Sequence, residues 1–169
     1  NEWKRTLLWE LYVRAYDFMA RREKQPREVY QQHKERLLEA FAEGEERARA
    51  LQHLDLLPGG YLLTVSADLV REHIRMIAQL DKESIVVGHR YSGAAHEITF
   101  CTQDKPYRLS ELCGVLAIND FTILNAFAFT RKDGKVVDVF VTEPVDRGDL
   151  MAPEETLLRI ERLRNGVGS

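Results

Sequence analysis

The stretch Glu97-Ile-Thr-Phe-Cys-Thr102, followed by the turn Gln103-Asp-Lys-Pro106, begins the part of the chain that decides its fold. In the first six residues Ile98, Phe100 and Thr102 fall on one side of an extended chain, which is typical of a strand. After the turn, apolar residues recur at steps of three and four: Leu109, Leu112, Cys113 and Leu116. This spacing predicts an amphipathic helix that packs on the sheet.

A hairpin follows this helix. Residues 122–130 and 135–142 both have strand patterns, and they flank Asp133-Gly134, which supplies the positive φ that a tight hairpin turn needs. The order strand, helix, strand, strand is the first part of a ferredoxin-like βαββαβ unit. The sequence therefore predicts an α+β fold with an antiparallel sheet.

Two further segments bear on the sheet. Residues 84–91 alternate as a strand before the unit begins, and Pro153 opens a last helix with acidic residues in its first turn, as the helix dipole prefers. No strand pattern follows that helix, so a regular unit with two helices is one strand short. We expect strand 84–91 to fill the vacant place and to give a permuted four-stranded sheet.

The first half of the chain is helical by its periodicity. Apolar residues from Trp3 to Met19 form one wide face, and a second, longer helix covers residues 26–51, with Gly44 as a point where it can kink or break. We expect a helical hairpin that ends at the turn or hinge Pro58-Gly59-Gly60. Ser66 is then a good N-cap for a connector helix. The expected units are a helical arm at 1–60, the connector helix at 61–82 and the sheet unit at 83–169.

The histidines and cysteines give no metal-binding pattern. His73 lies on the apolar face of the connector helix without a second ligand four residues further on, so we expect a packed histidine. Cys101 and Cys113 have no CxxC spacing, and we expect both to be plain buried thiols. We expect no cofactor in this chain.

Composition and charge argue against several classes of protein. The chain has 169 residues, 44% hydrophobic and 30% charged, which is enough to bury a core. Its net charge of -3, with both signs interspersed, gives no basic surface for nucleic acid. Because no apolar stretch is long enough for a membrane helix and the N-terminus lacks a signal-peptide pattern, we expect no membrane partner and a cytoplasmic location. The chain opens on Asn1 inside a helical pattern, and we expect a fragment of a longer protein.

Three segments carry a family resemblance. They are the helical stretch at 2–14, the stretch at 61–77, and residues 97–141, above all Asp104-Lys-Pro106, Ile123-Leu-Asn-Ala126 and Thr130-Arg-Lys-Asp-Gly134 with Asp138-Val-Phe140. Together they resemble the bacterial PII-protein uridylyltransferase/uridylyl-removing enzymes. The first looks like the helix after the HD hydrolase domain, the second is similar to the segment that joins this domain to the regulatory tail, and the third resembles the first ACT domain, a small module that binds amino acids.

The resemblance implies a function for the parent protein. In that family an N-terminal nucleotidyltransferase domain attaches UMP to the PII signal protein, the HD domain removes it, and the C-terminal ACT domains sense glutamine. This chain has neither a Gly-Ser followed by paired aspartates nor a His-Asp dipeptide, so we expect no catalytic residue in it. The implied partners are an amino-acid effector, here glutamine, the catalytic domains of the parent chain, and the PII protein through that parent.

The resemblance also implies a ligand site. In ACT domains the turn between the first strand and helix approaches the ligand with backbone groups. The corresponding residues here are Gln103, Asp104, Lys105, Pro106, Tyr107, Arg108 and Leu109. The family usually has glycine where this chain has Tyr107, whose side chain either fills the pocket or swings out to cover it. Lys105 and Arg108 either add charge for a carboxylate or are solvated surface residues.

Two alternatives stay open at this point. The chain could be a ligand-free interaction module, in which an open sheet edge or the apolar face of the first helix forms a homodimer or an intramolecular contact. It could also be an enzyme, with acids near strand ends at Asp104, Asp133 and Asp138. A turn, a hairpin and strand alternation explain the spacing of these acids better than acid/base catalysis does.

Overall fold

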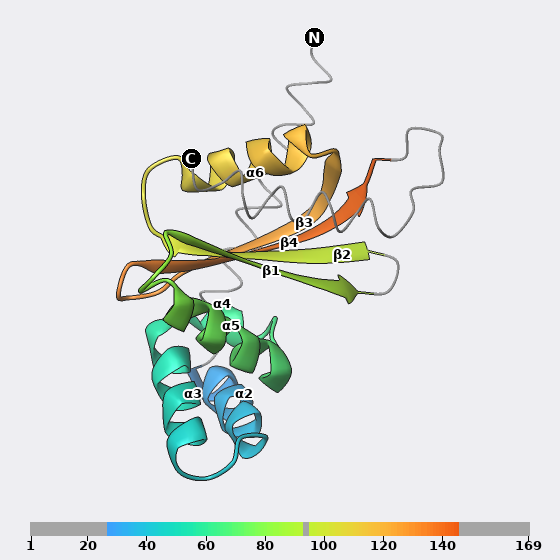
Figure 1. Cartoon of the computed structure of the whole chain (residues 1–169). Helices are drawn as coiled ribbons and strands as arrows, with labels where there is room; N and C mark the ends of the chain where they lie inside the picture. The colour runs from blue at the N-terminus through green and yellow to red at the C-terminus, as the bar shows by residue number, and fades with distance from the viewer. Residues whose placement is uncertain (1–26, 93–94, 146–169) are drawn as a thin grey trace, which may run out of the picture.

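The computed structural model describes residues 27–92 and 95–145 (Figure 1). In chain order its elements are α2 (Arg27–Glu39), α3 (Glu45–Leu56), α4 (Gly59–Leu62), α5 (Ala67–Gln79), β1 (Ile85–Ser92), β2 (Ala95–Gln103), α6 (Arg108–Ile118), β3 (Phe121–Thr130) and β4 (Lys135–Pro144). The helix expected near Trp3 and the one expected after Pro153 lie outside the described residues. Within them, the chain is an α+β structure, as the sequence predicts.

The four strands form one antiparallel sheet in the order β1-β2-β4-β3. Strands β2 and β3 both pair with β4, and α6 connects them, which is the split βαβ arrangement of a ferredoxin-like fold. Strand β1 pairs with β2 at the place that the last strand of a regular unit would take. The expected permuted sheet is therefore confirmed.

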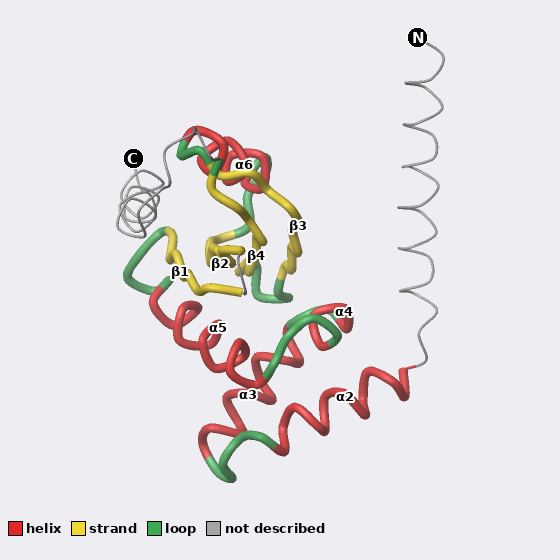
Figure 2. Tube along the Cα trace, turned by 90° about the vertical axis from the view of Figure 1, so that its right-hand side faces the viewer, coloured by secondary structure: helices red, strands yellow, loops and turns green. Residues whose placement is uncertain are grey.

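Helix α6 covers one face of the sheet, and the other helices lie on the opposite face (Figures 1 and 2). Under α6, the fully buried Leu112 and Leu116 pack with Ile98, Phe100 and Phe140. This agrees with the predicted apolar spacing, because side chains three and four residues apart share a helix face. Leu109 is an exception: it was expected on the packed face, but it is 45% exposed, because it belongs to the first turn of α6, beyond this core.

The connector helix α5 packs on the other face through Met76 and Ile77, which meet Cys101 and Val137. The predicted cap is confirmed, since the backbone N–H of Leu69 donates to the Ser66 hydroxyl at 3.3 Å. Strand β1 comes close to this helix at Gly88. A Cβ there would lie only 2.9 Å from the sulfur of Met76, so a side chain at this position would require the Met76 side chain to shift.

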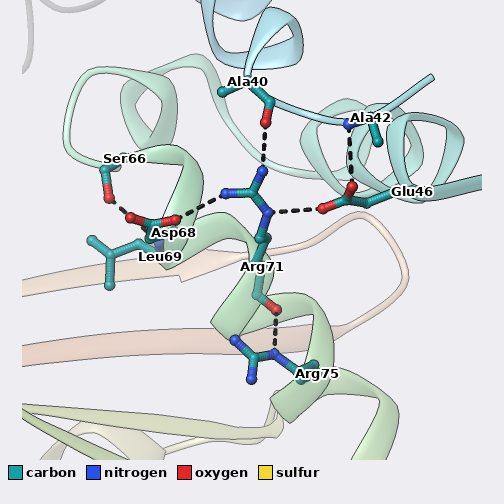
Figure 3. Close-up of polar contacts among 8 residues, drawn as sticks. All are labelled: Ala40, Ala42, Glu46, Ser66, Asp68, Leu69, Arg71 and Arg75. Carbon is teal, nitrogen blue, oxygen red and sulfur yellow. Dashed lines mark hydrogen bonds and ion pairs between the residues drawn. The ribbon is translucent and has the colours of Figure 1, made fainter.

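The expected long second helix is in fact two helices. The chain breaks at Gly44, which has a φ of 98°, and α2 and α3 form the hairpin on either side of it. Figure 3 shows how Arg71 of α5 fixes this break: its guanidinium donates to the carbonyl oxygen of Ala40, to Glu46 at 2.8 Å and to Asp68 at 2.9 Å. It also lies 4.5 Å over the Phe41 ring.

The Pro58-Gly59-Gly60 segment is not the flexible turn that was expected. It opens the one-turn helix α4, and neither glycine adopts a positive φ. Gly59 packs closely instead: a Cβ there would lie 3.1 Å from the ring of Tyr30, so this ring would have to move by a few tenths of an ångström. The turn brings Tyr61 into the core between helices and sheet, where it is fully buried and meets Phe129 edge-on at 5.2 Å.

A buried polar chain joins the β3–β4 hairpin to the helices. Arg131 lies 2.9 Å from His53, His53 lies 3.1 Å from the Tyr61 hydroxyl, and that hydroxyl lies 2.8 Å from His73. The packed histidine expected at position 73 is confirmed. Burial lowers the pKa of His53 to about 3, with the charge of Arg131 adding to the effect, and burial lowers the pKa of His73 to about 4.

Candidate ligand-binding site

The turn between β2 and α6 is held by the neighbouring hairpin. The backbone N–H of Asp104 donates to the carbonyl of Gly134 at 2.8 Å, and Gly134 has a φ of 78° at the tip of the predicted hairpin. At the end of the turn Tyr107 is the N-cap of α6 and has a φ of 66°. This left-handed conformation costs a non-glycine residue about 1–2 kcal/mol, which agrees with the glycine that the resembled family has at this place.

The first turn of α6 leaves two backbone donors unpaired. Tyr107 provides no side-chain cap, and the N–H groups of Leu109 and Ser110 have no acceptor within residues 27–92 and 95–145. The hydroxyl of Ser110 instead donates to the carbonyl of Tyr107 at 2.8 Å. Unpaired N–H groups at a helix N-terminus favour an anion, because the helix dipole adds to their own partial charge.

A hollow of about 450 Å³ opens beside these donors. Its lining comes from the turn, the first residues of α6, and strands β3 and β4: Asp104, Lys105, Tyr107, Arg108, Leu109, Ser110, Ala128, Thr130, Val136 and Asp138. Most of the residues predicted as a ligand site thus line one space. Gln103 and Pro106 do not: Gln103 ends β2 opposite Lys135, and Pro106 is exposed.

Asp138 forms part of the strand wall of the hollow. It is only 2% exposed, and its Oδ1 has no hydrogen-bond partner among the described residues. Burial raises the pKa of its carboxyl to about 6, and the negative charge of Asp104 contributes to the rise. A carboxylate in such a place destabilises the fold unless a donor or a cation reaches it.

The basic residues of the turn are already partly paired. Arg108 contacts Glu111 at 3.0 Å and Lys105 contacts the same carboxylate at 3.3 Å. The Arg108 side chain is 14% exposed, and its buried Nε has no partner among the described residues. Arg108 is therefore a largely buried cation with a free donor, whereas Lys105, whose side chain is 47% exposed, is a surface residue.

Unpaired buried polar atoms gather at this end of the sheet. Within the part of the chain that the structure describes, four buried side-chain atoms lack a partner, and three of them are Thr102 Oγ1, Arg108 Nε and Asp138 Oδ1. Thr102 pairs with Val136 across the strands, so it lies diagonal to Asp138 on the same face. Buried polar groups are paired in most native structures, so such a gathering marks a place where a ligand would complete the bonding.

Two predicted groups can now be placed. The Tyr107 side chain is 83% exposed, so it stands at the rim and does not fill the hollow. Asp133 is not part of the site, since its carboxylate pairs with Arg131 at 2.8 Å. Among the described residues, no group of three metal-binding side chains forms a metal site, and none of the helices there has the length and apolar character to cross a membrane.

Sequence reasoning missed the strand side of the hollow, formed by Ala128, Thr130, Val136 and Asp138. One signal was available. Asp138 lies between Val136 and Phe140 on the buried face of a strand. An acidic side chain is seldom buried without a partner, so its presence there indicates a role in binding.

Comparisons with known proteins bear on the family. No family model matches the chain. It is 28% identical to a bifunctional uridylyltransferase/uridylyl-removing enzyme of Rhodospirillum rubrum over 96% of its length, and 27% identical to such an enzyme of Idiomarina loihiensis over 97%. The chain is related to these uridylyltransferase enzymes. It spans 18% and 19% of their respective lengths, so the similarity concerns one part of each of these enzymes.

Over a shorter stretch, the chain is also similar to an enzyme of a different class. The chain is 47% identical over 53 residues to a serine/threonine-protein kinase of Arabidopsis thaliana, a stretch that covers 31% of this chain and 9% of the kinase. A part of this chain is thus also similar to part of a protein with another activity.

Proposed function

We propose that this chain is the amino-acid-sensing, regulatory part of a uridylyltransferase-like enzyme of nitrogen signalling, with an ACT-type domain in the sheet region. Glutamine is the proposed effector. In the full-length protein the signal passes to catalytic domains that modify the PII protein. The chain itself contributes ligand binding and no catalytic residue.

The observation that carries this proposal is the hollow at the start of α6. It presents unpaired N–H groups at Leu109 and Ser110 and the free Nε of Arg108, which suit a carboxylate, and an unpaired carboxylate at Asp138, which suits an ammonium group. A free amino acid carries both charges on one carbon. The volume of the hollow also suits a small ligand better than a macromolecule.

The comparisons support a regulatory module over a catalytic one. Uridylyl transfer and protein phosphorylation by a serine/threonine kinase are different reactions, so a short stretch common to both proteins fits a unit that is separate from either catalytic centre. This supports a regulatory role for at least part of the chain.

A thermal unfolding series tests the proposal. The chain is heated with each of the twenty amino acids at millimolar concentration, and Tyr107→Gly is measured beside the parent. A selective binder raises the stability by about 2.7 kcal/mol at a hundredfold excess over its Kd. A response to glutamine supports the proposal, and a response only in Tyr107→Gly shows that Tyr107 blocks the site. Silence in both variants contradicts amino-acid sensing by this part of the protein.

A second candidate function is self-association through β3. This strand lies at an edge of the sheet among the described residues, and its ten residues, Phe121–Thr130, include no charge. Natural edge strands usually carry charges that prevent pairing. The pairing of β3 with β4 has a register shift between Ile123 and Asn125, and such an irregularity works against pairing with another chain. Light scattering that shows a monomer at every concentration would rule out a dimer of this kind, whereas loss of a dimer in Ala126→Lys would support it.

A further inference from the structure

The inner wall of the hollow carries a charge that the chain itself does not neutralise. Asp138 Oδ1 has no hydrogen-bond partner among the described residues, although the side chain is almost fully buried. The two cations of the same lining, Lys105 and Arg108, both pair with Glu111 instead. Two cations of the β3–β4 hairpin are also engaged, since Arg131 pairs with Asp133 and Lys135 with Asp81. The described part of the chain therefore leaves Asp138 to be neutralised from outside.

A second carboxylate, the exposed Asp104, adds negative charge beside the same hollow. Asp104 lines the hollow at the turn, and after burial its negative charge is the second cause of the raised pKa of Asp138. Two carboxylates that repel each other across a partly enclosed space are both stabilised by one cation placed between them. The cation must be small and must donate hydrogen bonds, because Oδ1 lacks a donor.

A metal ion fits these groups less well than an ammonium ion does. Calcium takes six to eight oxygen ligands and magnesium takes six, whereas this hollow offers two carboxylates, and no cluster of three metal-binding side chains exists among the described residues. An ammonium group needs only two or three acceptors. The opposite side of the hollow, with the Leu109 and Ser110 N–H groups and Arg108 Nε, then has donors for an anion on the same ligand.

We infer that Asp138, assisted by Asp104, binds the primary ammonium group of the ligand, and that the hollow thereby selects α-amino acids against the corresponding carboxylic acids. This inference rests on the proposed function for the identity of the ligand. Asp138 is the residue that determines specificity, and the first turn of α6 binds the carboxylate. The amino-acid side chain is left to extend toward the rim, where Tyr107 stands.

The test compares ligands that lack one charge at a time. Calorimetric titrations near neutral pH use L-glutamine, 4-carbamoylbutanoate, which lacks the α-ammonium group, and 4-aminobutanamide, which lacks the carboxylate. Each is titrated into the parent chain, into Asp138→Asn and into Glu143→Gln, a matched control that removes an exposed carboxylate from the same strand. If glutamine does not bind, the tightest binder of the twenty amino acids and its two analogues take its place.

We expect Asp138→Asn to lose about tenfold or more in amino-acid affinity, the value of a charge-assisted bond, while Glu143→Gln binds as the parent does. Removing the ammonium group from the ligand should lower the affinity of the parent chain by the same factor. It should lower the affinity of Asp138→Asn only slightly further, because both changes delete the same interaction. Retention of full affinity by Asp138→Asn, or equal binding of the carboxylic acid and the amino acid, would overturn the inference.

The remaining outcomes separate this inference from the proposed function. Binding of 4-aminobutanamide or other primary amines, without binding of any amino acid, would overturn amino-acid sensing and support the role of Asp138. Amino-acid binding that does not depend on Asp138 would support sensing and overturn the role of Asp138. Binding of calcium or magnesium ions that Asp138→Asn abolishes, with no binding of amines, would also overturn the inference. Absence of binding by amino acids and amines alike would overturn both.

Discussion

Arg131 Nη1 donates to His53 Nδ1 across 2.9 Å, and this contact fixes the protonation of the buried chain behind it. The guanidinium is always charged and can only donate. His53 therefore carries its proton on Nε2 and donates it to the Tyr61 oxygen, and the Tyr61 hydroxyl donates to Nδ1 of His73. One hairpin residue thus determines the tautomers of two histidines in the helical region.

Tyr61→Phe should destabilise the fold by about 2–4 kcal/mol, because it removes one hydroxyl but leaves two buried imidazole nitrogens without a partner. Urea unfolding at neutral pH measures the change. Tyr91→Phe is the control, since Tyr91 is 58% exposed and should change stability by less than about 0.5 kcal/mol. Equal effects of the two substitutions would show that the buried chain contributes no stability.

The two histidines should make the fold sensitive to acid. Both have a pKa that is lower in the folded state than the ordinary 6.5, so the unfolded chain binds protons first as the pH falls. Their stabilisation is complete above pH 6.5 and is lost between there and pH 3 to 4, and it amounts to about 1–2 kcal/mol per histidine at about pH 5. His73→Gln should give a shallower loss of stability across this pH range. A His73→Gln profile as steep as that of the parent would contradict this account.

Asp138 should act in the opposite direction. Its folded pKa of about 6 lies above the ordinary 3.8, so its contribution to stability is full below pH 3.8 and is lost as the pH rises through 6. Asp138→Asn should therefore stabilise the chain by about 1–3 kcal/mol at neutral pH, with no gain near pH 4. Denaturant unfolding at both pH values checks this, with Glu143→Gln as the unchanged control. A destabilised Asp138→Asn at neutral pH would mean that the carboxylate has a partner in the free protein.

Tyr107→Gly and Tyr107→Ala should differ, although both remove the same exposed ring. Only glycine adopts a φ of 66° without a steric cost, so the glycine variant should be more stable than the alanine variant by about 1 kcal/mol. Guanidinium unfolding of the pair measures this difference without a contribution from the ring. Equal stabilities would show that the turn relaxes to a negative φ once the tyrosine is removed.

Much of the sheet could be predicted from the sequence, because the strand segments are rich in β-branched and aromatic residues and Gly134 marks the hairpin. The place of β1 could be predicted because the βαββαβ pattern lacked its last strand and one extra strand preceded it. The meaning of the glycines before it was harder to predict. Gly44 breaks a helix and Gly59 makes room for the Tyr30 ring, and only the packing of distant segments distinguishes these roles.

The candidate site was predictable on one side only. The turn 103–109 follows from local sequence and from the family resemblance. Asp138 reaches the hollow because β4 pairs with β2 in a register that sets it opposite Phe100, beneath the face that α6 covers. Register between strands distant in sequence depends on the whole sheet, so a local pattern could not bring Asp138 and Asp104 together.

The central claim is that an amino acid binds in the hollow at the start of α6. A titration of the ¹⁵N-labelled chain with L-glutamine, followed by the amide resonances, tests it most directly. The account predicts saturable shifts centred on Leu109 and Ser110, whose N–H groups are free, and on Asp138 of the facing strand. Shifts centred instead on the separate hollow between α3 and α5, lined by Arg71 and Arg75, or the absence of shifts at millimolar glutamine, would contradict it.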